Sequence, residues 1–114
     1  MHTQASNIKV AVDAIVFGYS KNDGVSVLLI KRKYAPYKDS WAIPGGFVLE
    51  HESLEEAVKR ELLEETGIKV SYLEQLYTFG DPKRDPRQRI VSIAYFEKVK
   101  SSQFQQLKAS TDAE

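Results

Sequence analysis

Three glutamates in the segment AVKRELLEETG, which are Glu61, Glu64 and Glu65, have the residue type and spacing to act together. The segment has the composition of a helix, in which side chains at i, i+3 and i+4 share one patch about a turn long. On a helical wheel, Glu61 and Glu65 fall among the apolar positions and Glu64 falls at their edge. The sequence therefore predicts that acidic side chains point toward the protein interior.

An isolated buried charge is costly, so inward carboxylates need compensation. Partner arginines, raised pKa values or a bound cation would each supply it. A ligand set made only of oxygens suits the hard cations Mg²⁺ and Mn²⁺, and Mg²⁺ commonly completes its shell with waters and substrate phosphates. This interpretation predicts a pyrophosphate site. The alternative is a solvated acidic face, which is the ordinary role of a charge run on a helix.

The elements that must position these carboxylates follow from hydrophobic pattern and turn residues. Ser53 and Glu56 form a capping-box pattern at the start of the helix, and Gly67 has the position of a C-cap. The first two strands are expected to form a hairpin, and a polar loop separates the last two. The predicted strands are 8–19, 25–33, 47–49, 69–79 and 88–99.

Length and composition indicate one mixed α/β domain over residues 1–114. Lys+Arg and Asp+Glu are 16 each and the chain has no cysteine, which argues against a dedicated nucleic-acid-wrapping domain and excludes disulfides and thiolate metal sites. The N-terminus lacks the apolar segment of a signal peptide, and no apolar run is long enough to cross a membrane, so a cytoplasmic protein is the simplest interpretation.

The segment that begins at Gly46 has a fixed pattern. Gly46 is followed by five residues and Glu52, then by seven residues and the run RELLEETGI, which starts at Arg60. This pattern, over residues 46–68, resembles the box of the Nudix hydrolases at every specified position. The resemblance implies a mixed β-sheet sandwiched by helices. It also implies hydrolysis of nucleoside diphosphates linked to another moiety, with divalent cations.

The resemblance also implies roles for single residues. Glu61, Glu64 and Glu65 would bind Mg²⁺, with Mn²⁺ as the alternative, and Glu61 would also take a proton from the attacking water. Arg60 would orient Glu61 by charge-assisted hydrogen bonding. Arg60, Glu61 and Glu64 are therefore the predicted catalytic residues.

Three further positions in the pattern of the family have weaker assignments. Gly46 would offer its carbonyl to the metal. Glu52 would support the loop or bind metal through water. Glu97 is considered as a base from a late strand, although ordinary exposure is the simpler interpretation.

A second segment, YTFGDPKRDPRQRIVSIAYF at 77–96, is similar to the branch of the family around ADP-ribose pyrophosphatases and NrtR-type regulators. It implies ADP-ribose as substrate, with AMP and ribose 5-phosphate as products. Without the resemblance, its charges are those of a solvated loop. Asp13 is considered as a pocket residue or as a partner of a loop arginine. The predicted substrate contacts are Phe17, Arg32, Arg87 and Arg89.

Two alternatives stay open. The first is the ADP-ribose-sensing half of an NrtR-like transcriptional regulator, whose DNA-binding winged helix would not fit in this chain, so we expect no direct nucleic-acid contact here. The second is a hydrolase that removes other nucleotides. The segment 100–114 is expected to be an incomplete remainder of the fold. A sheet face left bare by it would favour a homodimer or aggregation.

Overall fold

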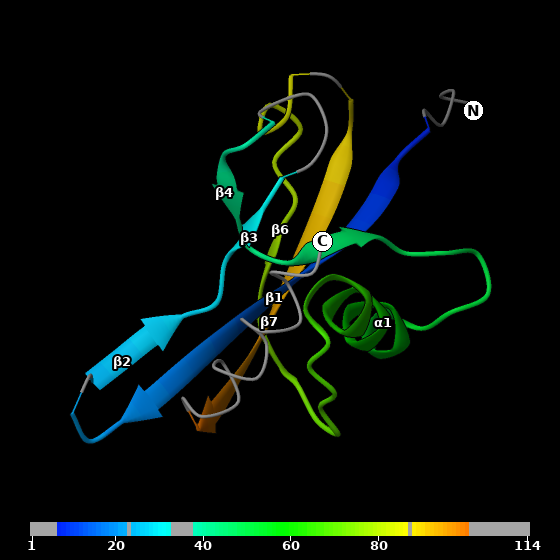
Figure 1. Cartoon of the computed structure of the whole chain (residues 1–114). Coiled ribbons are helices and arrows are strands. Elements are labelled where there is room, and N and C mark those ends of the chain that lie inside the picture. Colours follow the sequence, from blue (N-terminus) through cyan, green and yellow to red (C-terminus); the bar gives the residue numbers. More distant parts are fainter. Residues whose placement is uncertain (1–6, 23, 33–37, 87, 101–114) are drawn as a thin grey trace, which may run out of the picture.

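The computed structural model describes residues 7–22, 24–32, 38–86 and 88–100 of the 114-residue chain. Seven strands and one helix occur in this part of the chain (Figure 1). Their bounds are β1 Lys9–Ser20, β2 Gly24–Val27, β3 Ile30–Lys31, β4 Trp41–Ala42, β5 Gly45–Phe47, α1 Leu54–Thr66, β6 Glu74–Phe79 and β7 Ile90–Lys100.

The main sheet is mixed, and β1 lies at its centre. Its strand order is β2-β1-β7-β6, and β5 pairs with β1 as well. β1 runs parallel to β7 over almost its whole length and antiparallel to β2 and β5. β3 and β4 form a separate two-stranded sheet. The predicted hairpin of the first two strands is confirmed.

The helix α1 begins and ends where the sequence predicts. The Ser53 hydroxyl accepts a hydrogen bond from the Glu56 amide at 3.1 Å, and the Glu56 carboxylate accepts one from the Ser53 amide at 2.7 Å, so the capping box is complete. Gly67 has a φ of 79°, which glycine adopts without strain, and its amide donates to the Leu63 carbonyl at 2.9 Å.

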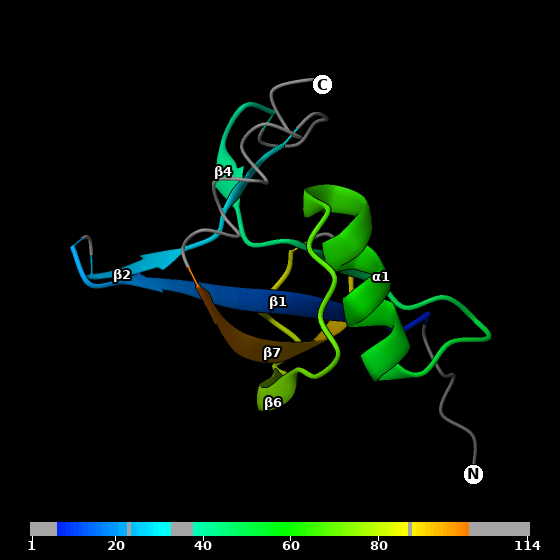
Figure 2. The ribbon, with the colours of Figure 1, turned by 60° about the horizontal axis from the view of Figure 1, so that its bottom comes forward.

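The core lies between α1 and one face of the sheet, as Figure 2 shows. Burial alternates along β1, where Val12, Ala14 and Val16 are fully buried and the residues between them are only partly buried. Ala57, Val58 and Leu62 are the fully buried apolar residues of α1 and belong to the same cluster. The even-numbered positions of β1 therefore face the helix, and the odd-numbered positions face the opposite side.

Three predicted strands were wrong in their bounds. The predicted strand 25–33 is divided into β2 and β3. The Leu28 amide still donates to the Val16 carbonyl of β1, but from Ile30 the chain pairs with β4 instead of β1. The predicted strand 47–49 lies at 45–47, where it pairs with β1. The predicted strand 69–79 begins only at Glu74, because Leu73 is buried against the core instead of pairing in the sheet.

The face of the sheet opposite α1 has no second helical layer among the described residues, in which α1 is the one helix. The segment 101–114, where we expect any further element, lies outside them. No helix in the same part of the chain is long and apolar enough to span a membrane.

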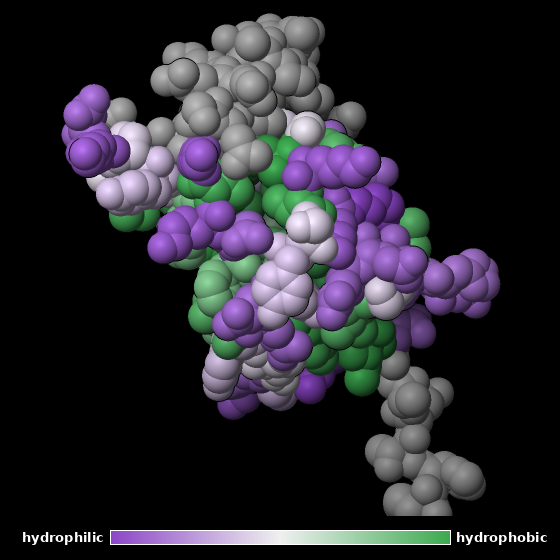
Figure 3. All heavy atoms as spheres, turned by 90° about the horizontal axis from the view of Figure 1, so that it is seen from below, coloured by the Kyte–Doolittle hydropathy of each residue, from purple (hydrophilic) through white to green (hydrophobic). Residues whose placement is uncertain are grey.

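Apolar side chains reach the surface at the edge strand β6. Leu76, Tyr77 and Phe79 are exposed, and the rings of Tyr77 and Phe79 meet edge to face at 4.9 Å. Figure 3 shows apolar side chains at the surface between hydrophilic ones on one face. The homodimer stays a prediction.

The burial of α1 gives a matched pair of substitutions. Leu62 is completely buried, whereas its neighbour Leu63 is 47% exposed. We expect Leu62→Ala to lower the free energy of unfolding by about 2–5 kcal/mol, because it leaves a cavity between helix and sheet. Leu63→Ala should stay within about 0.5 kcal/mol of wild type. Urea unfolding of both variants measures the difference, and equal losses would contradict this account of the core.

Candidate functional site

Arg60 of α1 lies at the centre of a network of hydrogen bonds between charged side chains. Its Nε and Nη2 donate to the two carboxylate oxygens of Glu52 at 2.9 and 2.7 Å. Its Nη1 donates to Glu61 at 2.8 Å and to Glu64 at 3.1 Å, and its Nη2 also donates to the Phe47 carbonyl at 3.1 Å. One guanidinium therefore joins the helix to the chain between β5 and α1.

Glu52 is held as an anion in this network. The bidentate hydrogen bonds from Arg60, with a further bond from the Leu49 amide at 2.8 Å, lower the pKa of Glu52 to about 2. The same pairing raises the pKa of Arg60 above its ordinary value. This geometry places Glu52 where it supports the loop before α1.

Glu61 and Glu65 point inward as the helical wheel predicts. The Glu61 side chain is 15% exposed and Glu65 is partly buried, whereas Glu64 lies at the edge with a side chain 60% exposed. Glu65 accepts a hydrogen bond from the Gly45 amide at 2.9 Å. Burial chiefly, together with the Glu61 and Glu64 carboxylates, raises the pKa of Glu65 to about 7. Glu65 is therefore a partly buried carboxyl beside two other carboxylates, with the Gly45 amide as a hydrogen-bond donor.

Two glycines of β5 lie between the helix and β1, and neither has room for a side chain. A Cβ on Gly46 would lie 2.6 Å from the Glu61 carboxylate. A Cβ on Gly45 would lie 2.3 Å from the Val12 carbonyl oxygen and 2.6 Å from the Asp13 carboxylate. The β5 backbone therefore lies against the Glu61 carboxylate on the side of α1 and against the Asp13 carboxylate on the other side.

The donors around Gly46 fit a hard divalent cation in kind. They are carboxylate oxygens of α1 and the neighbouring backbone carbonyls, and three carboxylates here already share the one guanidinium of Arg60. In the arrangement observed, no three acidic or histidine side chains of the described ranges enclose a metal site. Glu61 and Glu64 bond to Arg60 instead, so a cation would have to draw their carboxylates together.

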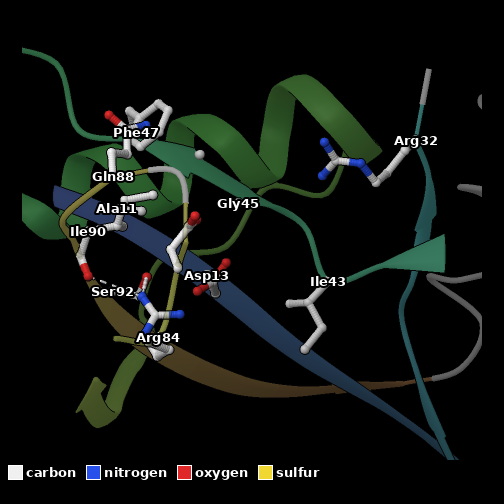
Figure 4. A pocket seen from close by; sticks show the side chains of 12 residues that line it. Ala11, Asp13, Arg32, Ile43, Gly45, Phe47, Arg84, Gln88, Ile90 and Ser92 are labelled. Carbon is white, nitrogen blue, oxygen red and sulfur yellow. Dashed lines mark hydrogen bonds between the residues drawn. The ribbon is translucent and has the colours of Figure 1, made fainter. Parts of the chain in front are cut away.

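A cleft of about 340 Å³ lies on the other side of β5, as Figure 4 shows. Residues from β1, β5 and β7 line it, together with the loop after β6, Arg32 after β3 and Ile43 between β4 and β5. They are Ala11, Asp13, Arg32, Ile43, Gly45, Gly46, Phe47, Arg84, Asp85, Gln88, Ile90 and Ser92. Because Gly45 and Gly46 also contact the glutamates of α1, the cleft adjoins the acidic patch.

Arg84 and Asp13 are oppositely charged residues that both line this cleft. The Nη2 of Arg84 donates to the Ser92 hydroxyl at 2.7 Å and to the Ile90 carbonyl at 3.2 Å. Burial raises the pKa of Asp13, and the charge of Arg84 opposes that rise. Sequence reasoning did not select Arg84 or Ser92. The signals for Arg84 were its place between the turns that start at Asp81 and Asp85 and its position in the segment that resembles the ADP-ribose branch of the family.

The predicted substrate contacts are only partly brought together. Arg32 lines the cleft. The Nη1 of Arg89 donates to the Gly80 carbonyl, and neither Arg89 nor Phe17 is among the lining residues. Arg87 lies outside the described residues.

Glu97 is placed away from the acidic patch. It lies opposite Val16 in the sheet and accepts a hydrogen bond from the Lys98 amide at 2.7 Å. Gly46 pairs with Val12, which is about 13 Å from Val16 along the strand. Ordinary partial exposure therefore describes Glu97.

Comparison with known proteins agrees with this geometry. An ADP-ribose pyrophosphatase of Methanocaldococcus jannaschii is 43% identical over 104 residues, which are 91% of this chain and 57% of that protein. An ADPR responsive transcriptional repressor, NtrR, of Acinetobacter baylyi is 42% identical over 97 residues, which are 83% of this chain and 38% of that protein. This chain thus spans only part of the length of either curated relative.

Solved structures and family models lead to the same family. The Nudix domain of Shewanella oneidensis NrtR, crystallised with ADP ribose, matches with a TM-score of 0.77 and 37% identity, covering 84% of this chain and 63% of that one. The model of the NUDIX domain matches residues 8–114. With the box residues gathered around one acidic patch, the chain belongs to the Nudix family.

Proposed function

We propose that this domain hydrolyses the diphosphate of a nucleoside diphosphate derivative, and that ADP-ribose is its substrate, giving AMP and ribose 5-phosphate. The observation that carries the proposal is the gathering of the Glu61, Glu64 and Glu65 carboxylates where α1 meets β5, because a divalent cation bound to them would in turn hold a diphosphate. The similarity to an ADP-ribose pyrophosphatase supports the choice of substrate.

Four groups would hold Mg²⁺ or Mn²⁺ in this proposal: the carboxylates of Glu61, Glu64 and Glu65 and the carbonyl of Gly46. Glu52 is a fifth candidate through water, but its two oxygens already bond to Arg60. When bound, the cation would neutralise the diphosphate and make the attacking water more acidic.

The residues of the chain then have distinct tasks. Arg60 donates to Glu61 and Glu64, so it fixes the direction of both carboxylates. The Gly45 amide does the same for Glu65. Glu61 accepts the proton of the water that attacks phosphorus, and the bond from that phosphorus to the bridging oxygen breaks.

A second candidate function is ligand sensing without turnover. The 42% identity to an ADP-ribose-responsive repressor favours it, because such a domain would need the cleft and not the catalytic step. In either case we place no nucleic-acid contact in this domain, whose basic and acidic residues balance at 16 each.

Substitutions at the two glycines of β5 should have different effects, one on stability and the other on metal binding. Gly45→Ala would drive a Cβ against the backbone of β1, so we expect a loss of about 1–3 kcal/mol in the free energy of unfolding. Gly46→Ala meets only the flexible end of Glu61, so it should keep most of the stability while displacing that carboxylate and weakening Mn²⁺ binding. Urea unfolding and Mn²⁺ titration measure the two effects. Equal behaviour of the two variants would contradict the geometry.

Release of AMP from ADP-ribose with Mg²⁺ tests the proposed reaction. We expect metal-dependent turnover in wild type and a loss of at least about 100-fold in Glu64→Gln and Glu65→Gln, since even residues that merely support a metal ligand contribute about 10–100-fold. Glu55→Gln, in the exposed first turn of α1, is the matched control and should keep its activity.

Other outcomes of this assay identify the alternatives. Binding of ADP-ribose by wild type without turnover would contradict the hydrolase and support the sensor. Turnover of other nucleotides in place of ADP-ribose would leave the reaction class standing and overturn the substrate.

A further inference from the structure

Asp13 has a position that the proposed reaction does not use. It lies in the middle of β1, opposite Gly45 of β5 and Ala94 of β7, on the face of the sheet away from α1. Its carboxylate is partly buried and lines the cleft (Figure 4). The helix glutamates lie on the other side of β5, so Asp13 belongs to a different part of the site.

The surroundings of Asp13 hold it in place. A Cβ on Gly45 would lie 2.6 Å from its carboxylate oxygen, so its carboxylate lies directly against the β5 backbone. Arg84 supplies the nearby positive charge, and Arg84 is itself fixed by the Ser92 hydroxyl and the Ile90 carbonyl. The carboxylate is therefore pre-organised within the cleft, which favours ligand binding because less freedom is lost.

The chemistry of a carboxylate limits what it could recognise. An ionised carboxylate only accepts hydrogen bonds, and it repels phosphate. On a nucleoside diphosphate sugar, the paired hydroxyls of a ribose offer two neighbouring donors for its two oxygens. The cleft adjoins the acidic patch through Gly45 and Gly46, so a ligand whose diphosphate lies at the patch would extend a ribose into it.

We propose that Asp13 is a specificity residue that accepts hydrogen bonds from the vicinal hydroxyls of a ribose bound in the cleft. This proposal rests on the proposed function for the identity of the ligand. The ribose is either that of the adenosine or the terminal one, since both carry the same pair of hydroxyls. The positive charge of Arg84 favours the ionised form of this carboxylate.

The test compares Asp13→Asn with wild type in binding of two non-hydrolysable ligands with Mg²⁺, the α,β-methylene analogues of ADP-ribose and of ADP. Asn keeps the size of Asp but replaces one acceptor with a donor. We expect at least about tenfold weaker binding of the ADP-ribose analogue, as for hydrogen bonds to a charged group. Asp81→Asn, an exposed loop aspartate outside the cleft lining, is the matched control and should bind as wild type does.

The two ligands distinguish the two sources of the hydroxyls. A loss for the ADP-ribose analogue alone supports recognition of the terminal ribose, and a loss for both supports the adenosine ribose. Unchanged binding of both, with a shifted melting temperature, would overturn the proposal and leave Asp13 as a structural partner of Arg84.

The role of Asp13 and the proposed function are tested by different measurements. Wild-type turnover of ADP-ribose alone decides the function, whereas the ratio of variant to wild-type affinity decides the role of Asp13. Intact hydrolysis with an unchanged ratio overturns only this inference. Absence of ADP-ribose turnover, together with no binding of either analogue by wild type, overturns both.

Discussion

The surplus of negative charge between α1 and β5 is the constraint on which the site depends. Arg60 bonds to three carboxylates at once, and Glu65 adds a fourth, whose pKa is raised to about 7 chiefly by burial. A helix that carries such a surplus on its inner side is stable only because its other inward residues are fully buried and both of its ends are capped. The fold tolerates this unfavourable charge in the one place where the proposed chemistry would use it.

The strand β5 connects the two halves of the site because it has no side chains at Gly45 and Gly46. On one side its amide and backbone meet Glu65 and Glu61, and on the other they meet Asp13 and the cleft. A ligand could thus contact the acidic patch and the cleft while bound along one strand. β1 supports this arrangement by pairing with both β5 and β7.

Local signals predicted the helix and its carboxylates well. The capping box and Gly67 gave the bounds of α1, and the wheel placed Glu61 and Glu65 inward, because both depend on residues close in sequence. The cleft was harder to predict, since only the pairing of β1 with β7 brings Asp13 to the same cleft as Arg84 and Ser92. The predicted bounds of β6 were wrong for a similar reason. An apolar residue such as Leu73 is compatible with a strand or with a core position outside the sheet, and tertiary packing decides between them.

The proposed reaction depends on a divalent cation that binds the carboxylates between α1 and β5. The most direct measurement is the melting temperature of the metal-free protein near neutral pH as Mg²⁺ or Mn²⁺ is added. We expect a saturable rise of several degrees, because a cation that binds only the folded state stabilises it by mass action. A melting temperature that does not respond to either cation, in a protein that stays folded, would contradict this proposal.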